Sequence, residues 1–144
     1  WSIWPDNLFE NVRKLAVNCW SCVNAPAQFA GIAAIDGPQD AVDAMMQAFD
    51  RRRKLVTRLL NTLPGVSAIT PKGAFYACPN ISQTGWTAKR LASALLEDAG
   101  VATIGGPDFG VLGEGYLRLS YANSEENIER ALVRMSDVLQ RTAP

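Results

Sequence analysis

Apolar positions recur at helical spacing along much of the chain, and shorter apolar runs between them have the residue pattern of strands. The spacing predicts helices over residues 5–17, 27–35, 39–62, 87–99 and 124–139. It predicts strands over residues 66–69, 74–77, 101–104 and 116–122. Helices therefore alternate with strands in the later part of the chain. This order predicts an α/β fold with an α+β small domain, in which helices pack on a short mixed sheet.

Three of these helices carry an apolar stripe that we expect to form the core. In helix 39–62 the stripe is Val42, Met45, Met46, Phe49, Val56, Leu59 and Leu60. In helix 87–99 it is Leu91, Leu95 and Leu96, and Gly100 closes the helix. In the last helix it is Ile128, Ala131, Leu132, Met135, Val138 and Leu139, after the predicted N-cap Ser124.

A single arginine lies inside the last strand-like run. Alternation places Leu117, Leu119 and Tyr121 on one face of this strand and Arg118 on the other, between Tyr116 and Ser120. No acidic residue of the strand can pair with Arg118. A half-buried guanidinium needs an anion, and its planar donors suit a carboxylate. The residue pattern leaves two alternatives open: a binding site for a ligand carboxylate, or a salt bridge to a distant Asp or Glu.

Composition excludes several classes of function. The chain has 144 residues, enough for one sizeable core, and 14 basic residues balance 14 acidic ones. Without a basic excess the sequence gives no sign of nucleic-acid binding, and without a long apolar run it gives none of a membrane span. With no histidine, the chain lacks every histidine-based nucleophilic or metal site.

The three cysteines do not suggest a disulfide framework or a metal site. Their number is odd, and Cys19 and Cys22 would need two more zinc ligands where only Cys78 remains. We expect free, buried thiols in a reducing, cytoplasmic setting and no bound metal. The glycine-rich segment 105–110 lacks the lysine and serine of a phosphate-binding loop, so it predicts a tight turn between strands.

Four motifs in order resemble the class I/II aminotransferases, fold-type I enzymes that use pyridoxal phosphate. They are Ser21–Gln28 (SCVNAPAQ), Pro71–Tyr76 (PKGAFY), Pro107–Gly115 (PDFGVLGEG) and Arg118–Ala122 (RLSYA). The resemblance covers nearly the whole chain. It implies an enzyme that transfers an amino group between an amino acid and a 2-oxo acid, and that works as a homodimer in amino-acid metabolism.

The resemblance also implies roles for individual residues. Arg118 would bind the α-carboxylate of the substrate, which favours the ligand alternative over the salt bridge. Phe75 would lie near the cofactor and substrate, and the alternative is a place in the core. Asn24 would lie in a loop near the active-site entrance and the dimer interface, while Tyr76 and Tyr116 are expected to serve packing. No cofactor-binding residue is assigned.

The sequence departs from the family in one respect. The lysine that links to the cofactor lies in an S-x-x-K segment, which we expect upstream of Trp1, because Lys14, Lys54, Lys72 and Lys89 all lie in the wrong context. We therefore expect a C-terminal portion that is inactive alone. Residues 1–36 would be the end of the large domain with helices on the dimer side, and residues 37–144 the small domain.

The sequence leaves other functions open. A lyase or synthase of the same fold would use the same strand arginine. A free-standing carboxylate-binding or interaction module is an alternative of a different class. Residues 17–24 contain no arginine, which argues against the aspartate-specific subgroup that carries a second arginine there.

Overall fold

The structure, a computed structural model, describes residues 2–140. The chain divides into two compact units, and the division falls between Ala41 and Val42, a few residues past the expected boundary. The assignment of the first unit to a large domain and of the second to a small domain stays a prediction.

The first unit contains two exposed helices, α1 (Asp6–Cys19) and α2 (Ala25–Asp36). Neither contains a buried residue. The Asn24 side chain caps α2 by accepting a hydrogen bond from the N–H of Ala27 at 2.9 Å, and Pro26 occupies the first turn. Both helices confirm the sequence-based prediction.

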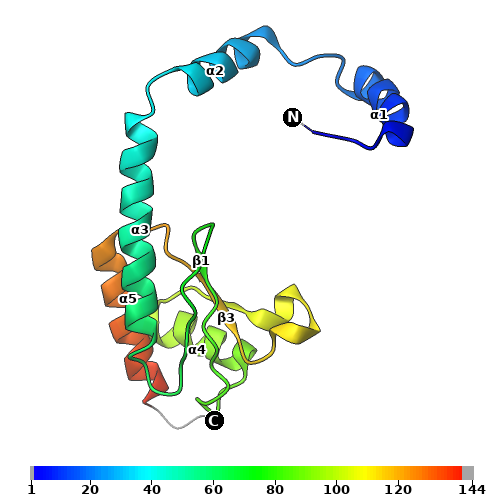
Figure 1. The fold of residues 1–144 in the computed structure, drawn as a ribbon. Helices are drawn as coiled ribbons and strands as arrows, with labels where there is room; N and C mark the ends of the chain where they lie inside the picture. The colour runs from blue at the N-terminus through cyan, green and yellow to red at the C-terminus, as the bar shows by residue number, and fades with distance from the viewer. Residues whose placement is uncertain (1, 141–144) are drawn as a thin grey trace. The chain divides into compact units, whose positions relative to one another are not determined.

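The second unit packs three helices on a small sheet (Figure 1). The helices are α3 (Asp40–Leu60), α4 (Ala88–Ala99) and α5 (Glu125–Leu139). The strands are β1 (Tyr76–Ala77), β2 (Ile104–Gly105) and β3 (Leu117–Ser120), in the order β1-β3-β2. Two short 3-10 turns, η1 (Gly106–Phe109) and η2 (Val111–Gly113), connect β2 to β3. The predicted fold class is confirmed, but both strand pairs are antiparallel, so the sheet is not mixed.

One face of the sheet joins the core. Leu117 and Tyr121 are each 1% exposed and lie on the face that the alternation predicted. They pack with the buried stripes of the three helices, chiefly Val56, Leu60, Leu91, Leu95, Leu132, Met135 and Val138. Gly100 ends α4 with φ +64°, a left-handed conformation that glycine adopts without strain. The other face of β3, which carries Arg118, is left outside the core.

Several predicted core residues lie at the surface instead. Val42, Met45 and Met46 are exposed because α3 joins the core only from its later turns, where Leu55, Val56 and Leu60 are buried. Leu96 is also exposed, since the buried stripe of α4 is Ala88, Leu91 and Leu95. All three cysteines are free, as predicted, but they are exposed rather than buried.

The strand predicted over residues 66–69 does not form. Ser67 makes an isolated bridge to Asn80, and the pairing stops there. The Asn61 side chain instead bonds both backbone groups of Ala68, accepting from its N–H and donating to its carbonyl oxygen at 2.9 Å each. A side-chain amide thus satisfies the backbone groups that a neighbouring strand would otherwise pair. Within the described residues, no helix is long and apolar enough to cross a membrane.

Candidate carboxylate-binding site

The register of the sheet brings Tyr76 and Arg118 together. Tyr76 of β1 pairs with Ser120 of β3, and Arg118 lies two residues before Ser120, so both side chains stand on one face as diagonal neighbours. The Arg118 Cζ atom lies 4.4 Å from the centre of the Tyr76 ring. Ile104 of β2 is the direct cross-strand partner of Arg118. Strand pairing alone therefore sets the arginine beside an aromatic ring.

A second ring reaches Arg118 from the β2–β3 connection. Phe109, the last residue of η1, places its ring centre 4.3 Å from the Arg118 Cζ atom. Both distances are well inside the range of a cation–π interaction, which is worth about 0.5–1 kcal/mol at an exposed site and more when water is excluded. We call Tyr76 and Phe109 the aromatic pair.

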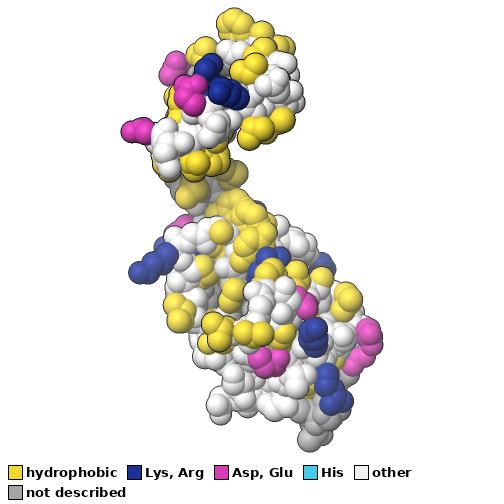
Figure 2. Space-filling model, turned by 90° about the vertical axis from the view of Figure 1, so that its right-hand side faces the viewer, with side chains coloured by type: hydrophobic (Ala, Val, Ile, Leu, Met, Phe, Trp, Pro, Cys, Tyr) yellow, Lys and Arg dark blue, Asp and Glu magenta, His cyan; other side chains and the backbone are white. Residues whose placement is uncertain are grey.

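Arg118 is half-buried and has no protein anion as partner in the described part of the chain. The distant salt bridge that the sequence left open is therefore not formed by residues 2–140. The guanidinium carries in-plane N–H donors, which suit the two oxygens of a carboxylate. Figure 2 looks at the side on which η1 and η2 project, where hydrophobic side chains and positive side chains lie next to each other.

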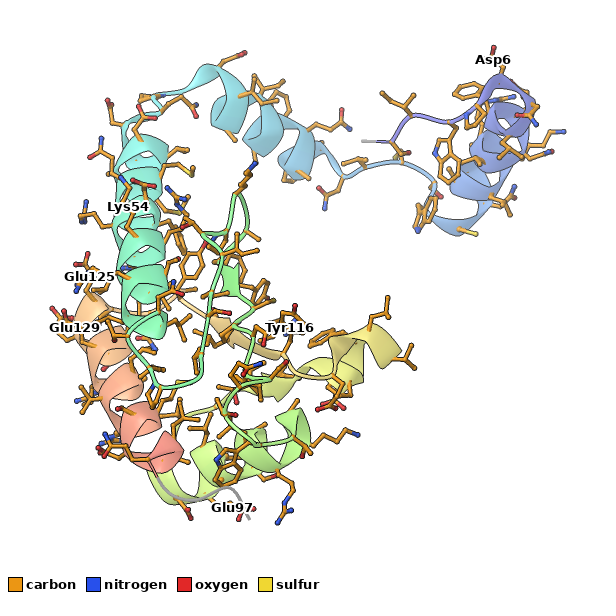
Figure 3. All side chains as sticks on the ribbon, turned by 60° about the horizontal axis from the view of Figure 1, so that its bottom comes forward. Asp6, Lys54, Glu97, Tyr116, Glu125 and Glu129 are labelled. Atoms are coloured by element: carbon orange, nitrogen blue, oxygen red, sulfur yellow. The ribbon has the colours of Figure 1, made fainter. Side chains whose placement is uncertain are left out.

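The turn that carries Phe109 is held at both of its ends. Gly106 and Gly113 approach so closely that a Cβ on Gly106 would lie 1.9 Å from the carbonyl oxygen of Gly113. The N–H of Gly106 also donates to the carbonyl oxygen of Tyr116 at 2.8 Å. Figure 3 shows Tyr116 where the turn joins the sheet. Both glycines are required here for close approach of two backbones rather than for chain flexibility.

Two polar contacts join the same turn to α4. The Glu114 carboxylate accepts a hydrogen bond from the N–H of Ala88 at 3.1 Å. The N-cap residue Thr87 makes no such side-chain bond, so Glu114 caps the helix from a distant part of the sequence. Lys89 forms an exposed ion pair with Asp108 at 3.5 Å. Exposed pairs contribute little energy, so we assign the anchoring to Glu114 and the glycine contact.

Aromatic contacts continue from the site into α3. Phe75 lies against Tyr76, with ring centres 4.6 Å apart, and against Phe49, with centres 6.2 Å apart. Phe49 in turn contacts Tyr121 edge-on at 6.4 Å. The hydroxyl of Tyr121 donates to the carbonyl oxygen of Ala74 at 2.9 Å, and burial raises the pKa of this phenol. Phe75 thus contacts Tyr76, and no cation–π contact joins its ring to Arg118 among the described residues.

Comparison with known proteins decides the family. The model of a family described as aminotransferase class I and II matches residues 1–135. The chain belongs to this family. The resemblance drawn from its four motifs is confirmed.

Similar proteins include an aspartate aminotransferase from Pyrococcus horikoshii, 38% identical over 94% of this chain and 35% of that protein. A putative aminotransferase, YugH from Bacillus subtilis, is 38% identical over 96% of this chain and 36% of its own length. Among solved structures, an aromatic aminotransferase from Pyrococcus horikoshii is 39% identical, with a TM-score of 0.86 over 94% of this chain and 36% of that chain. The chain therefore spans about a third of the length of the curated relatives it matches.

The lysines of this aminotransferase chain do not fit the linkage to the cofactor. Enzymes of the family use pyridoxal phosphate, which an amino group of the enzyme holds, and such a lysine needs a desolvated position. Lys54 pairs with Asp50 at 2.6 Å and Lys89 pairs with Asp108, and all four lysines are exposed. None of these four lysines therefore has the desolvated position that a cofactor-linking lysine needs.

Two of the three residues that the sequence proposed lie in the same unit. Arg118 and Phe75 lie in the second unit, one contact apart through Tyr76. Asn24 lies in the first unit, where its side chain is engaged as the cap of α2. Its placement near an active-site entrance stays a prediction.

Sequence reasoning missed the aromatic pair. It treated Tyr76 as a packing residue and passed over Phe109 as part of a turn. Tyr76 could have been found by pairing residues 74–77 with the arginine strand, because the same alternation that isolates Arg118 selects every second residue of its neighbour. The sequence carries no such signal for Phe109, since its position depends on the path of the turn.

Proposed function

We propose that this chain supplies the substrate-carboxylate site of a pyridoxal-phosphate-dependent aminotransferase, and that Arg118 is the residue that binds the carboxylate. The observation that supports the proposal is the Arg118 guanidinium, which stands off the core between β1 and η1 without a protein carboxylate among the described residues. Membership of the aminotransferase family supports the same choice of ligand.

The chemistry of the residue follows from its donors. Two parallel N–H groups of Arg118 would hold both oxygens of the α-carboxylate of an amino acid or a 2-oxo acid. Such a clamp fixes the orientation of the Cα–H bond without taking part in bond breaking. The chain alone would be inactive, because it offers no desolvated lysine to hold the cofactor. The full-length protein would act in the cytoplasm as a homodimer.

Steady-state kinetics of the full-length protein test this function. With pyridoxal phosphate and 2-oxoglutarate present, we expect transamination of at least one of L-aspartate, L-tyrosine and L-alanine. Aspartate and aromatic amino acids come first because two relatives bear those names. R118K should lower kcat/KM about 10- to 100-fold, since a charged, bidentate hydrogen-bonded pair is worth about 1.5–3 kcal/mol.

The matched control is R51K. Arg51 is exposed and pairs with Glu125 at 3.3 Å on the helical side of the unit, so the same chemical change there should leave kcat/KM unaltered. Equal kinetics of R118K and wild type would refute the role of Arg118. Pyridoxal phosphate can also be added to the 144-residue chain. An absorbance spectrum typical of a protein-bound cofactor would contradict the expectation that the chain is inactive alone.

A further inference from the structure

We infer that Tyr76 and Phe109 are positioning residues, which hold the guanidinium plane of Arg118 ready for the incoming carboxylate. The inference deepens the proposed function and rests on it. Its starting observation is that the ring centres of both side chains lie within 4.4 Å of the Arg118 Cζ atom. No protein carboxylate among residues 2–140 performs this task.

A guanidinium without such contacts would sample many rotamers. Ordering a long side chain at the moment of binding reduces affinity, whereas a side chain already in place binds at no such cost. Rings that cover the flat surface of a guanidinium leave its N–H edges free, and those edges are what a carboxylate needs. The aromatic pair therefore orders Arg118 without competing for its donors.

The two rings are held by different means. Tyr76 belongs to β1 and is held by strand pairing and by its contact with the Phe75 ring. Phe109 is more than half exposed, at 58%, and contributes little to the core. Its ring is placed by the turn, which Gly106, Gly113 and Glu114 tie to the sheet and to α4. Because Phe109 is so exposed, its side chain adds little to the stability of the fold. Its contact with Arg118 explains its position better.

Proton NMR of the 144-residue chain provides a test that needs neither cofactor nor activity. Protons of Arg118 next to the faces of two rings should resonate upfield of those of an exposed arginine such as Arg51. F109L should remove part of this shift, and Y76L another part, while Y76F should preserve it because its ring remains. Leu112 is the matched control: it lies in the same turn, is 92% exposed, and L112A should leave the Arg118 resonances in place.

Kinetics of the full-length enzyme test the consequence. F109L should raise the KM for 2-oxoglutarate about 3- to 30-fold while kcat changes much less, as expected for the loss of a cation–π contact that orders a binding residue. The Ki of 3-phenylpropanoate, a carboxylate without an amino group, should rise by the same factor. F109Y and Y76F keep an aromatic ring, so both should retain the wild-type KM and Ki. L112A should not differ from wild type.

A double variant decides whether the rings act through Arg118. In the R118K background, F109L should add little, since the planar group that stacks on the ring is gone. Full additivity of the two losses, or an unchanged Arg118 resonance in F109L, would overturn the inference. Failure of the proposed function would be seen separately, as absence of transamination by the wild-type enzyme. The NMR shifts of Arg118 would still test the contact with the two rings, because they do not depend on activity.

Discussion

The Glu114 carboxylate accepts a hydrogen bond from the backbone N–H of Ala88, 26 positions earlier in the sequence. It thereby caps α4, whose own N-cap residue Thr87 makes no side-chain bond. The same residue follows η2 directly, so one contact serves both the start of a helix and the end of the turn that carries Phe109. This pair therefore links the start of α4 to the turn that carries Phe109.

Removal of the Glu114 carboxylate should destabilise the fold. E114A should lower the free energy of unfolding by about 1 kcal/mol, as is usual for the loss of a helix cap, with a further small loss from the favourable charge at the helix N-terminus. Urea denaturation followed by circular dichroism measures this change. The control is Glu97, which is exposed on the outer side of α4 (Figure 3), and E97A should have a smaller effect. Equal losses for both variants would exclude a cap.

Gly106 should not tolerate any side chain. In G106A the new Cβ would have to avoid the carbonyl oxygen of Gly113, a backbone atom that has no other rotamer to adopt. We expect a loss of about 1–3 kcal/mol and a displaced Phe109, detected as a lost upfield shift of the Arg118 protons. At Gly73 no atom lies within 4 Å of the Cβ position, so G73A should be close to wild type. A G106A variant of wild-type stability would show that the turn is not closed as described.

Tyr121 should make stability fall at high pH. Burial raises the pKa of its phenol above the unfolded value near 10, so the folded state holds the proton more tightly. The stabilisation is complete below pH 10 and is lost as the pH rises through the folded-state pKa. Y121F should lose about 1 kcal/mol at pH 8, from the bond to Ala74, and should show a smaller decline in melting temperature above pH 10. If the melting temperature of Y121F declined above pH 10 as steeply as that of the wild type, the decline would be due to other groups.

Phe75 should affect substrate binding only through Tyr76. F75L removes the ring that lies against Tyr76, and we expect a KM increase smaller than that of Y76L. In the double variant the F75L effect should vanish, because the ring that it supports is absent. Kinetics of the two single variants and the double variant form the cycle that measures this coupling. A persistent effect of F75L in the Y76L background would support direct contact of Phe75 with substrate or cofactor, as the sequence resemblance suggested.

Local patterns were sufficient for the helices and for the face of the arginine. The 3.6-residue spacing in α5 and its N-cap Ser124 are confirmed, with the Ser124 hydroxyl accepting from the N–H of Asn127 at 3.2 Å. The alternation in β3 correctly buried Leu117 and Tyr121 and left Arg118 outside the core. These features depend on residues close in sequence, whose chemistry is visible in a linear pattern.

Features that depend on distant partners could not be read in the same way. The sequence predicted a strand over residues 66–69, but in the structure the Asn61 side chain pairs with the backbone groups of Ala68. It placed Met45 and Met46 in the core, although the core covers only the later turns of α3. In each case the outcome was decided by which surface lay opposite, a property of packing rather than of the segment.

Arg118 illustrates the difference between what local sequence determines and what distant contacts determine. By itself the sequence determined that Arg118 would stand on the face of β3 opposite to Leu117 and Tyr121, with no carboxylate in its own strand, since alternation along a strand requires no tertiary information. Only the tertiary structure decided what lies beside it. Antiparallel register brought Tyr76 to the same face, and a turn closed by Gly106 and Gly113 brought Phe109, because contacts between segments far apart in sequence are fixed by the path of the backbone.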